Sequence, residues 1–171
     1  DQQALVQWIA AGLTIPAVRS LYGDAAYLLG NMIAKYSLAA PEYQISCAAL
    51  EKLEFMEVDL DLAYSRSRFY GKHMPFLFEH PIPSSVVRKH LLDKVLNVEA
   101  VGRILKEAGP VTLILRAEDD ALTAAGLRSS MPQNWIWGDD VFARYDRANI
   151  KISLKKLKIY PFCIKKIEKK K

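Results

Sequence analysis

The sequence lacks any apolar stretch long enough to cross a membrane. Its most apolar region, near the N-terminus, is interrupted by Arg19, Asp24 and Lys35 and so contains no uncharged span of about 18 residues or more. Cysteine is also scarce, because Cys47 and Cys163 lie far apart and form no CxxC pair. Neither a disulfide framework nor a zinc site is therefore indicated. Two such thiols fit a reducing, cytoplasmic compartment, and we expect no association with a membrane.

The motifs of nucleotide-dependent enzymes are missing as well. The chain contains neither the GxGxxG run of dinucleotide-binding folds nor the GxxxxGK[ST] run of phosphate-binding loops. Ser129 and Ser130 have no assignable base partner, so a serine nucleophile is not indicated. We therefore predict no cofactor and no metal site.

Arginine is absent from the end of the chain, and acids are nearly so. Residues 151–171 include nine lysines and one acid, a formal charge of +8, whereas residues 1–150 carry −3. Lysine contacts phosphate as a point charge, whereas the arginine fork reads base edges. The split predicts a polyanionic partner such as nucleic acid, or pairing with the protein's own acidic face. The lysines expected to contact nucleic acid are Lys155, Lys156, Lys158, Lys165 and Lys166.

Length and composition predict a single α+β domain that is predominantly helical, with a small sheet near the C-terminus. The 171 residues are enough to bury a core, and 51% hydrophobic and 25% charged residues are globular values. Residues 1–149 are expected to form a helix-rich globular domain. Residues 150–171 are expected to form a lysine-rich strand and tail that packs at least in part on this domain, because Ile150, Ile152 and Leu154 alternate as in a half-exposed strand.

The spacing of apolar residues predicts the individual elements. Steps of three and four residues indicate helices over 2–12, 17–38, 86–96 and 98–108. Short apolar runs beside prolines or acids indicate strands over 76–78 and 111–115. The acids at 118–120 suit the first turn of a helix that Gly126 ends. Ser84 or Ser85 is expected to cap the helix that follows it.

A longer helix is predicted from Pro41 to near Gly71. Its apolar stripe, with steps of four and three residues, comprises Ile45, Ala49, Leu53, Met56, Leu60 and Ala63. On a neighbouring face Glu54, Glu57 and Asp61 form a row of carboxylates. This acidic helix face predicts a site for an oppositely charged protein partner.

The histidines are concentrated in one part of the chain, since His73, His80 and His90 lie within eighteen residues. Histidine exchanges protons near neutral pH. Arg66 and Arg68 precede His73 with six and four residues between. This spacing resembles the signature of the HEPN ribonucleases, an all-helical family that cleaves RNA without a metal ion. The resemblance implies that His73 transfers a proton and that Arg66 or Arg68 stabilises phosphate charge.

A second fragment, EHPIP at 79–83, resembles the first half of an HNH nuclease. In that family a histidine activates water and the neighbouring acid binds a divalent cation. The resemblance implies these roles for His80 and Glu79. The second half of the motif should supply an asparagine and a further histidine or asparagine; Asn97 is present, but no histidine follows His90.

Two functions remain open from the sequence. The first is nucleic-acid processing, in particular by a small ribonuclease, with the lysine tail holding the polyanion. Its candidate catalytic residues are His73, His80, Arg66, Arg68 and Glu79. The second is a non-catalytic binding module, such as an immunity, antitoxin or adaptor protein, that recognises an oppositely charged partner. Histidines that converge in one cleft favour the first function, and histidines buried far apart favour the second.

Overall fold

The structure is a computed structural model that describes residues 2–19, 24–94 and 97–160. These residues form a single α+β domain with eight α-helices, one short 3-10 helix and a five-stranded mixed sheet. In chain order the elements are α1 (Gln2–Gly12), α2 (Pro16–Arg19), α3 (Asp24–Leu38), β1 (Glu42–Ser46), α4 (Cys47–Phe55), β2 (Ala63–Tyr64), η1 (Arg66–Arg68), β3 (Phe76–Glu79), α5 (Ser84–Leu92), α6 (Val98–Glu107), β4 (Thr112–Leu115), α7 (Arg116–Ala124), α8 (Ala143–Arg147) and β5 (Ile152–Ile159). No helix within the described ranges is long and apolar enough to cross a membrane.

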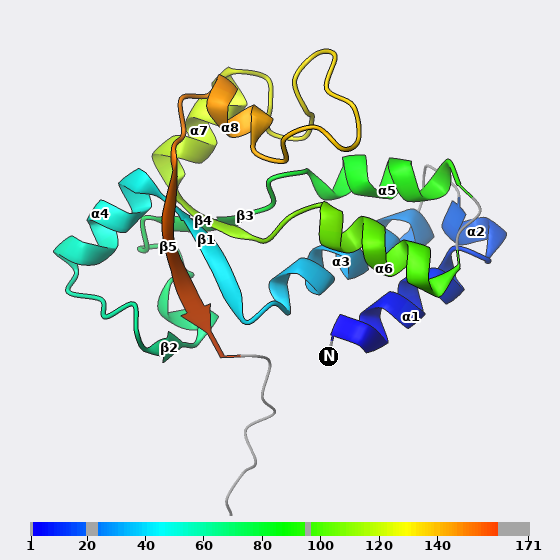
Figure 1. Cartoon of the computed structure of the whole chain (residues 1–171), viewed down its shortest axis with the longest axis horizontal. Helices are drawn as coiled ribbons and strands as arrows, with labels where there is room; N and C mark the ends of the chain where they lie inside the picture. Colours follow the sequence, from blue (N-terminus) through cyan, green and yellow to red (C-terminus); the bar gives the residue numbers. More distant parts are fainter. Residues whose placement is uncertain (1, 20–23, 95–96, 161–171) are drawn as a thin grey trace, which may run out of the picture.

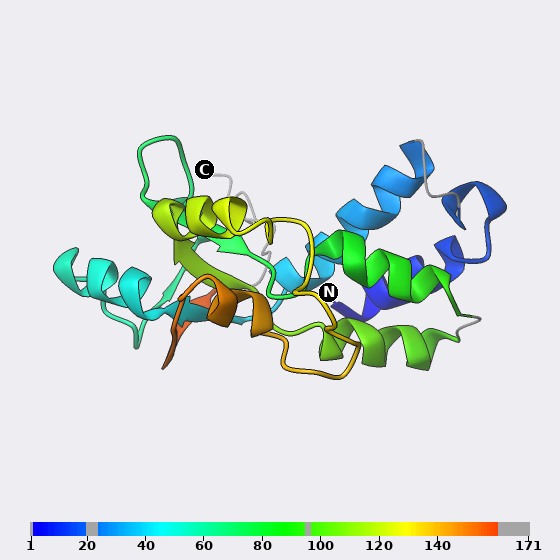
Figure 2. The same ribbon diagram turned by 90° about the horizontal axis from the view of Figure 1, so that it is seen from above.

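Five helices, α1, α2, α3, α5 and α6, gather at one end of the molecule (Figure 1), and the view from above shows the same separation from the sheet (Figure 2). We call this end the helical half, and the sheet with α4, α7 and α8 the sheet half. The helices α1, α3, α5 and α6 meet in one apolar core. In α6, Val101, Ile104 and Leu105 are buried at helical spacing, whereas Arg103 and Lys106 face solvent.

The sheet has the strand order β2-β5-β1-β4-β3. β1 and β4 are parallel, as are β2 and β5, whereas β1–β5 and β3–β4 are antiparallel pairs. The last described strand of the chain therefore lies inside the sheet rather than at its edge. The register of β5 shifts against β1 between Lys156 and Ile152, so the strand pairing is irregular there, and Leu154 within this stretch is fully exposed.

Helices cover both faces of the sheet. Leu113 and Ile114 are neighbours on β4 and so point to opposite faces. Leu113 packs in a core with Leu53 of α4, whereas Ile114 packs in another with Leu122 of α7 and Tyr145 of α8. The sheet half therefore has two smaller cores where the helical half has one.

The parallel strands β1 and β4 each lead directly into a helix, and one hydrogen-bonded pair joins the two helix starts. Ser46 Oγ accepts a hydrogen bond from Ala49 N (3.1 Å) and so caps α4. The same hydroxyl donates to Glu118 Oε2 (2.6 Å), which also accepts from Leu115 N (2.8 Å) at the start of α7. Glu118 therefore acts as a capping residue, as its place in the first turn predicts.

The structure contradicts the prediction of one long helix from Pro41 to near Gly71. The apolar stripe that predicted it crosses from β1 into α4, and a turn and β2 follow. In β1, Tyr43 and Ile45 are fully buried at the two-residue spacing of a strand. Soon after α4 ends, Glu57 takes a left-handed φ of 54°, which a continuing helix does not permit.

The acidic helix face is lost with that helix. Glu54 lies on α4, whereas Glu57 and Asp61 lie in the segment that follows it. The three carboxylates therefore do not share one helical face.

The sequence predicted a sheet near the C-terminus, and the structure shows strands spread through the chain instead. The strands β1, β2 and β3 come from its first half. A five-stranded sheet likewise differs from the all-helical architecture that the HEPN resemblance implies. The prediction that Ser84 or Ser85 caps α5 is wrong too. Pro83 occupies the N-cap position, and the helix starts at Ser84 without a side-chain cap.

Other predicted elements are confirmed. The helices over 2–12 and 98–108 match α1 and α6, the strands over 76–78 and 111–115 match β3 and β4, and Gly126 follows α7 with a left-handed φ of 71°. The predicted helix over 17–38 corresponds to α2 and α3, with residues 20–23 outside the described residues.

Candidate functional site

The predicted arginines lie on η1, a single 3-10 turn rather than a regular helix. Ser65 Oγ accepts from Ser67 N (3.4 Å) at its start. Arg66 Nη1 donates to Leu38 O (3.2 Å), which ties η1 to the end of α3. The guanidinium of Arg68 lies over the ring of Tyr64, 4.5 Å from its centroid, in a cation–π contact.

His73 lies in the exposed loop between η1 and β3. Arg116 at the start of α7 holds this loop, because its guanidinium donates to Gly71 O and Met74 O (both 2.9 Å). His73 therefore belongs to the same short stretch as Arg66 and Arg68, but it is not on their turn.

The pairing of β2 with β5 brings η1 next to the lysine-rich strand. Ala63 pairs with Lys158 and Tyr64 with Ile159. The chain then continues along β2, because Tyr160 N donates to Tyr64 O (2.9 Å). We call Tyr64, Arg66, Arg68, Lys158 and Tyr160 the β2–β5 corner. It unites predicted catalytic arginines with a predicted nucleic-acid-binding lysine from a distant part of the sequence.

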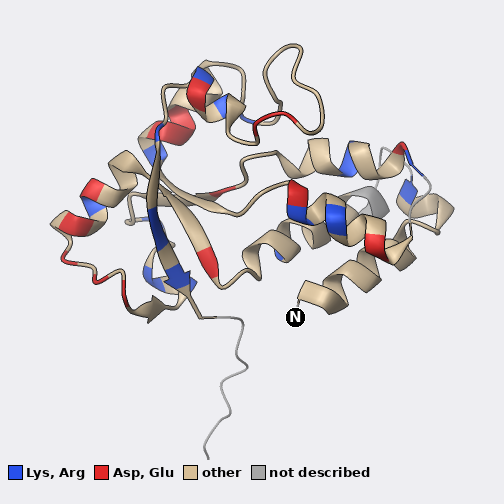
Figure 3. Cartoon of the chain, viewed as in Figure 1, with Lys and Arg blue, Asp and Glu red and all other residues tan. Residues whose placement is uncertain are grey.

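The other described lysines of β5 contact acids of the same chain. Lys155 Nζ lies 2.9 Å from Glu54 Oε1, and Lys156 Nζ lies 3.5 Å from Glu42 Oε2. Figure 3 shows the basic residues of β5 between the acidic segment after α4 and the acidic start of β1. The predicted pairing of the tail with the protein's own acids is thus present in part.

Lys158 has a different partner, since its ammonium group donates to the backbone oxygen of Asp61 (3.2 Å). A groove of about 570 Å³ is lined both by α4 with the segment that follows it and by the lysines of β5. Its lining residues are Glu54, Val58, Asp59, Leu60, Asp61, Lys155, Lys156 and Lys158. The predicted contacts Lys165 and Lys166 lie outside the described residues.

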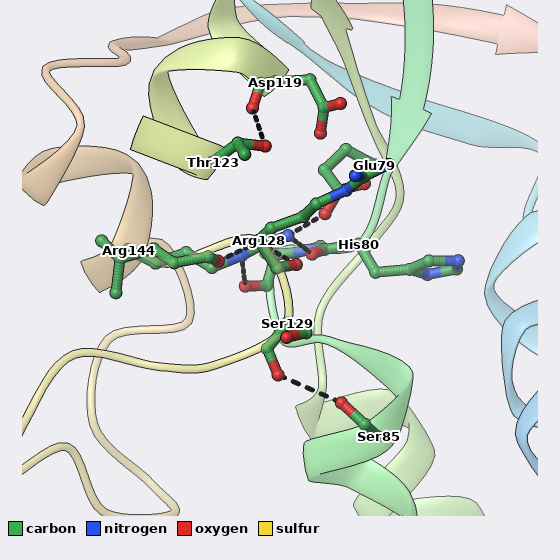
Figure 4. A network of polar contacts seen from close by, with 10 residues as sticks. Glu79, His80, Ser85, Asp119, Thr123, Arg128, Ser129 and Arg144 are labelled. Atoms are coloured by element: carbon green, nitrogen blue, oxygen red, sulfur yellow. Dashed lines mark hydrogen bonds and ion pairs between the residues drawn. The ribbon is translucent and has the colours of Figure 1, made fainter. Parts of the chain in front are cut away.

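Glu79 and His80 lie elsewhere, around a completely buried arginine. Arg144 of α8 has no exposed surface. Its guanidinium is paired with the carboxylate of Glu79 and donates to the backbone oxygens of His80, Pro81 (2.8 Å), Leu127 (2.7 Å) and Arg128 (3.1 Å). We call this set the Arg144 cluster (Figure 4). It fastens α8 to the connection between β3 and α5 and to the loop after α7.

The Arg144 cluster does not suit proton transfer near neutral pH. Burial, with the charge of Arg144 as a second cause, lowers the pKa of His80 to about 4, so its imidazole is neutral at physiological pH. The ring also points away from Arg144 and Glu79 (Figure 4). Burial raises the pKa of Glu79, and Arg144 acts in the opposite direction. Both residues of the HNH-like fragment are thus held in a structural network.

His90 has a third environment. Its ring stacks on Trp137 with centroids 3.9 Å apart and planes 8° apart. Trp137 Nε1 donates to Glu107 Oε2 (2.9 Å), so this stack fastens the loop after α7 to the helical half. The three histidines therefore lie in three different surroundings: an exposed loop, a partly buried turn and a ring stack.

Sequence reasoning missed Arg144, Tyr64 and Tyr160 as members of these two sites. Arg144 lies in a short helix among other charged residues, and its carbonyl partners are set by tertiary structure alone. The tyrosines meet only because β2 pairs with β5. No local pattern could have identified either set.

In the part of the chain that the structure describes, no group of three or more His, Cys, Asp or Glu side chains is arranged to hold a metal ion. Comparison of the chain with protein-family models, with curated proteins and with solved structures found no match.

Proposed function

We propose that this protein is a non-catalytic module that binds the phosphate backbone of nucleic acid at the β2–β5 corner. The observation that carries the proposal is that strand pairing joins Lys158 to β2, the strand that leads into the turn bearing Arg66 and Arg68. Neighbouring cations of this kind, together with exposed tyrosine, suit sequence-independent contact with phosphate. A cytoplasmic location belongs to the same proposal and rests on the cysteine usage alone.

The ion pairs of β5 leave its lysines available to phosphate. In the Lys155–Glu54 pair the side chains are 59% and 53% exposed, and exposed pairs of this kind contribute about 0–1 kcal/mol. Lys158 donates to an uncharged backbone oxygen, so its positive charge is not neutralised there. Lys155 and Lys156 pair with Glu54 and Glu42, so these carboxylates present less negative charge to a basic protein partner.

The test is a binding measurement with a charge-matched control. Lys158→Glu and Arg68→Glu should each weaken binding of a fluorescent oligonucleotide at low salt and lower the salt slope by about 0.7–0.9. Lys89→Glu on α5 makes the same change of charge at an exposed position of the helical half and should have little effect. Equal losses in all three variants, or no binding of the wild type at low salt, would contradict the proposal.

RNA cleavage is a second candidate, favoured by the exposure of His73 in the loop that follows Arg66 and Arg68. His73 would transfer the proton and the arginines would stabilise phosphate charge. Incubation of RNA and DNA with the wild type and with His73→Ala, each with and without EDTA, tests this candidate. Cleavage that disappears in His73→Ala supports it. Intact substrate in every lane, or equal cleavage by both proteins, rejects it.

A further inference from the structure

The β2–β5 corner contains aromatic rings as well as cations. Tyr160 is 61% exposed although it follows a buried residue, Ile159. Its backbone N–H is bonded to Tyr64 O (2.9 Å), so its position is fixed by the edge of the sheet. The aromatic side chain of Tyr160 is thus held at the surface, on the same face of the strand as Lys158.

Arg68 and Tyr64 make up the other side of the corner. The guanidinium lies over the Tyr64 ring, and the edge of that ring packs against Phe69 at 5.6 Å between centroids. Phe69 is itself buried in the core of the sheet half. The ring of Tyr64 is therefore supported from the core, and it holds the charge of Arg68 at a defined place on the surface.

A fixed cation beside an exposed ring distinguishes single-stranded from double-stranded nucleic acid. Phosphates are present in both, but only an unpaired strand offers the face of a base to a side chain. Stacking of this kind tolerates any base, because every base has a π face. It therefore adds a preference for strand form without adding a preference for sequence.

We propose that the corner selects single-stranded nucleic acid, with one base stacked on Tyr160 and a neighbouring phosphate held by Lys158. This inference rests on the proposed function, since it assumes that the phosphate contacts exist. It goes further by assigning the class of ligand and the residue that recognises it.

The test compares three labelled probes of equal length: a single-stranded oligonucleotide, its duplex, and an abasic strand that keeps the phosphates but has no bases. The wild type should bind the single strand more tightly than the other two. Tyr160→Ala should weaken single-strand binding about 5- to 100-fold and leave binding of the abasic strand unchanged. Tyr160→Phe, which keeps the ring, should retain the preference.

Tyr27→Ala is the matched control, because Tyr27 is also exposed but lies on α3 in the helical half. It should bind all three probes as the wild type does. If the wild type binds the abasic strand or the duplex as tightly as the single strand, the stacking inference is wrong while the proposed function stands. If no probe binds at low salt, the proposed function fails and the inference fails with it. The wild-type comparison decides the matter even if Tyr160→Ala does not fold.

Discussion

The two halves of the molecule close their cores in different ways. In the helical half the core is built from apolar side chains such as Ile9, Leu91 and Ile104. The helical half buries one polar side chain among its described residues, Ser37, whereas the sheet half buries the hydrogen-bonded Ser46 and Arg144. A core of apolar side chains is stabilised by the area that is buried, and most substitutions remove only part of that stabilising free energy. A core with buried polar groups also depends on individual hydrogen bonds, each of which is costly to lose.

The largest effect on this comparison is expected from Arg144→Ala. Removal of the guanidinium leaves Glu79 without its buried partner and several backbone oxygens without a donor. The free energy of unfolding should fall by about 3–5 kcal/mol, measured by urea denaturation. Arg147→Ala on the same helix removes an exposed arginine and should change stability by about 0.5 kcal/mol or less.

A double variant sharpens the same test. Arg144→Met fills part of the volume but still leaves Glu79 unpaired, and the addition of Glu79→Gln should recover stability. Leu91→Ala in the helical half should cost about 2–5 kcal/mol through a cavity, and Glu79→Gln should not restore it. Additive losses in the Arg144–Glu79 pair would show that the cluster is not a coupled unit.

The next effect in size concerns pH. Burial lowers the pKa of His80 from 6.5 to about 4, so between these values the unfolded chain takes up a proton that the folded protein does not. Stability should therefore fall as the pH drops through this window, by at most about 3 kcal/mol from His80. The raised pKa of Glu79 acts in the opposite sense, because it lets the folded state bind a proton first.

The contribution of His80 is thus the difference between the wild type and His80→Gln, each unfolded by urea at several pH values. The variant should lose less stability on acidification. Parallel curves for the two proteins would mean that His80 is as easily protonated in the fold as in the unfolded chain.

A smaller effect is expected at the link between the two helix starts. Ser46→Ala removes the cap of α4 and one hydrogen bond to Glu118, and should cost about 1–2 kcal/mol. Ser65→Ala at η1 removes an exposed and longer contact and is the control, with an expected loss well below that of Ser46. Similar losses in the two variants would show that burial adds nothing to the cap.

The sequence predicted the helical half better than the sheet half. Helices such as α6 have a clear periodicity because one side packs and the other meets water. At the junction of β1 and α4 the same rule failed, because Ile45, Ala49 and Leu53 continue a helical spacing across a strand end. All three are buried in one core, so the apolar spacing correctly predicted that they are buried but did not distinguish strand from helix.

The candidate sites were predictable only in part. The sequence identified the arginines at 66 and 68 and the lysines of β5 from local composition. It did not reveal that Lys158 and Tyr64 adjoin, which depends on register between distant strands. Nor did it separate His80 from His73, because burial and exposure are properties of the fold rather than of the fragment that contains each histidine.

The position of β5 has a consequence for the order in which the molecule is made. β5 is the last described strand to leave the ribosome, yet it supplies the partner of β2 and one side of β1. Until β5 has been synthesised, one edge of β1 is unpaired, and an unpaired strand edge can form hydrogen bonds with other chains. The helical half can assemble once α6 has emerged, while the sheet waits for β5. Contacts between segments so distant in the chain also slow folding, so the lysine-rich strand completes the fold as well as supplying the charge of the corner.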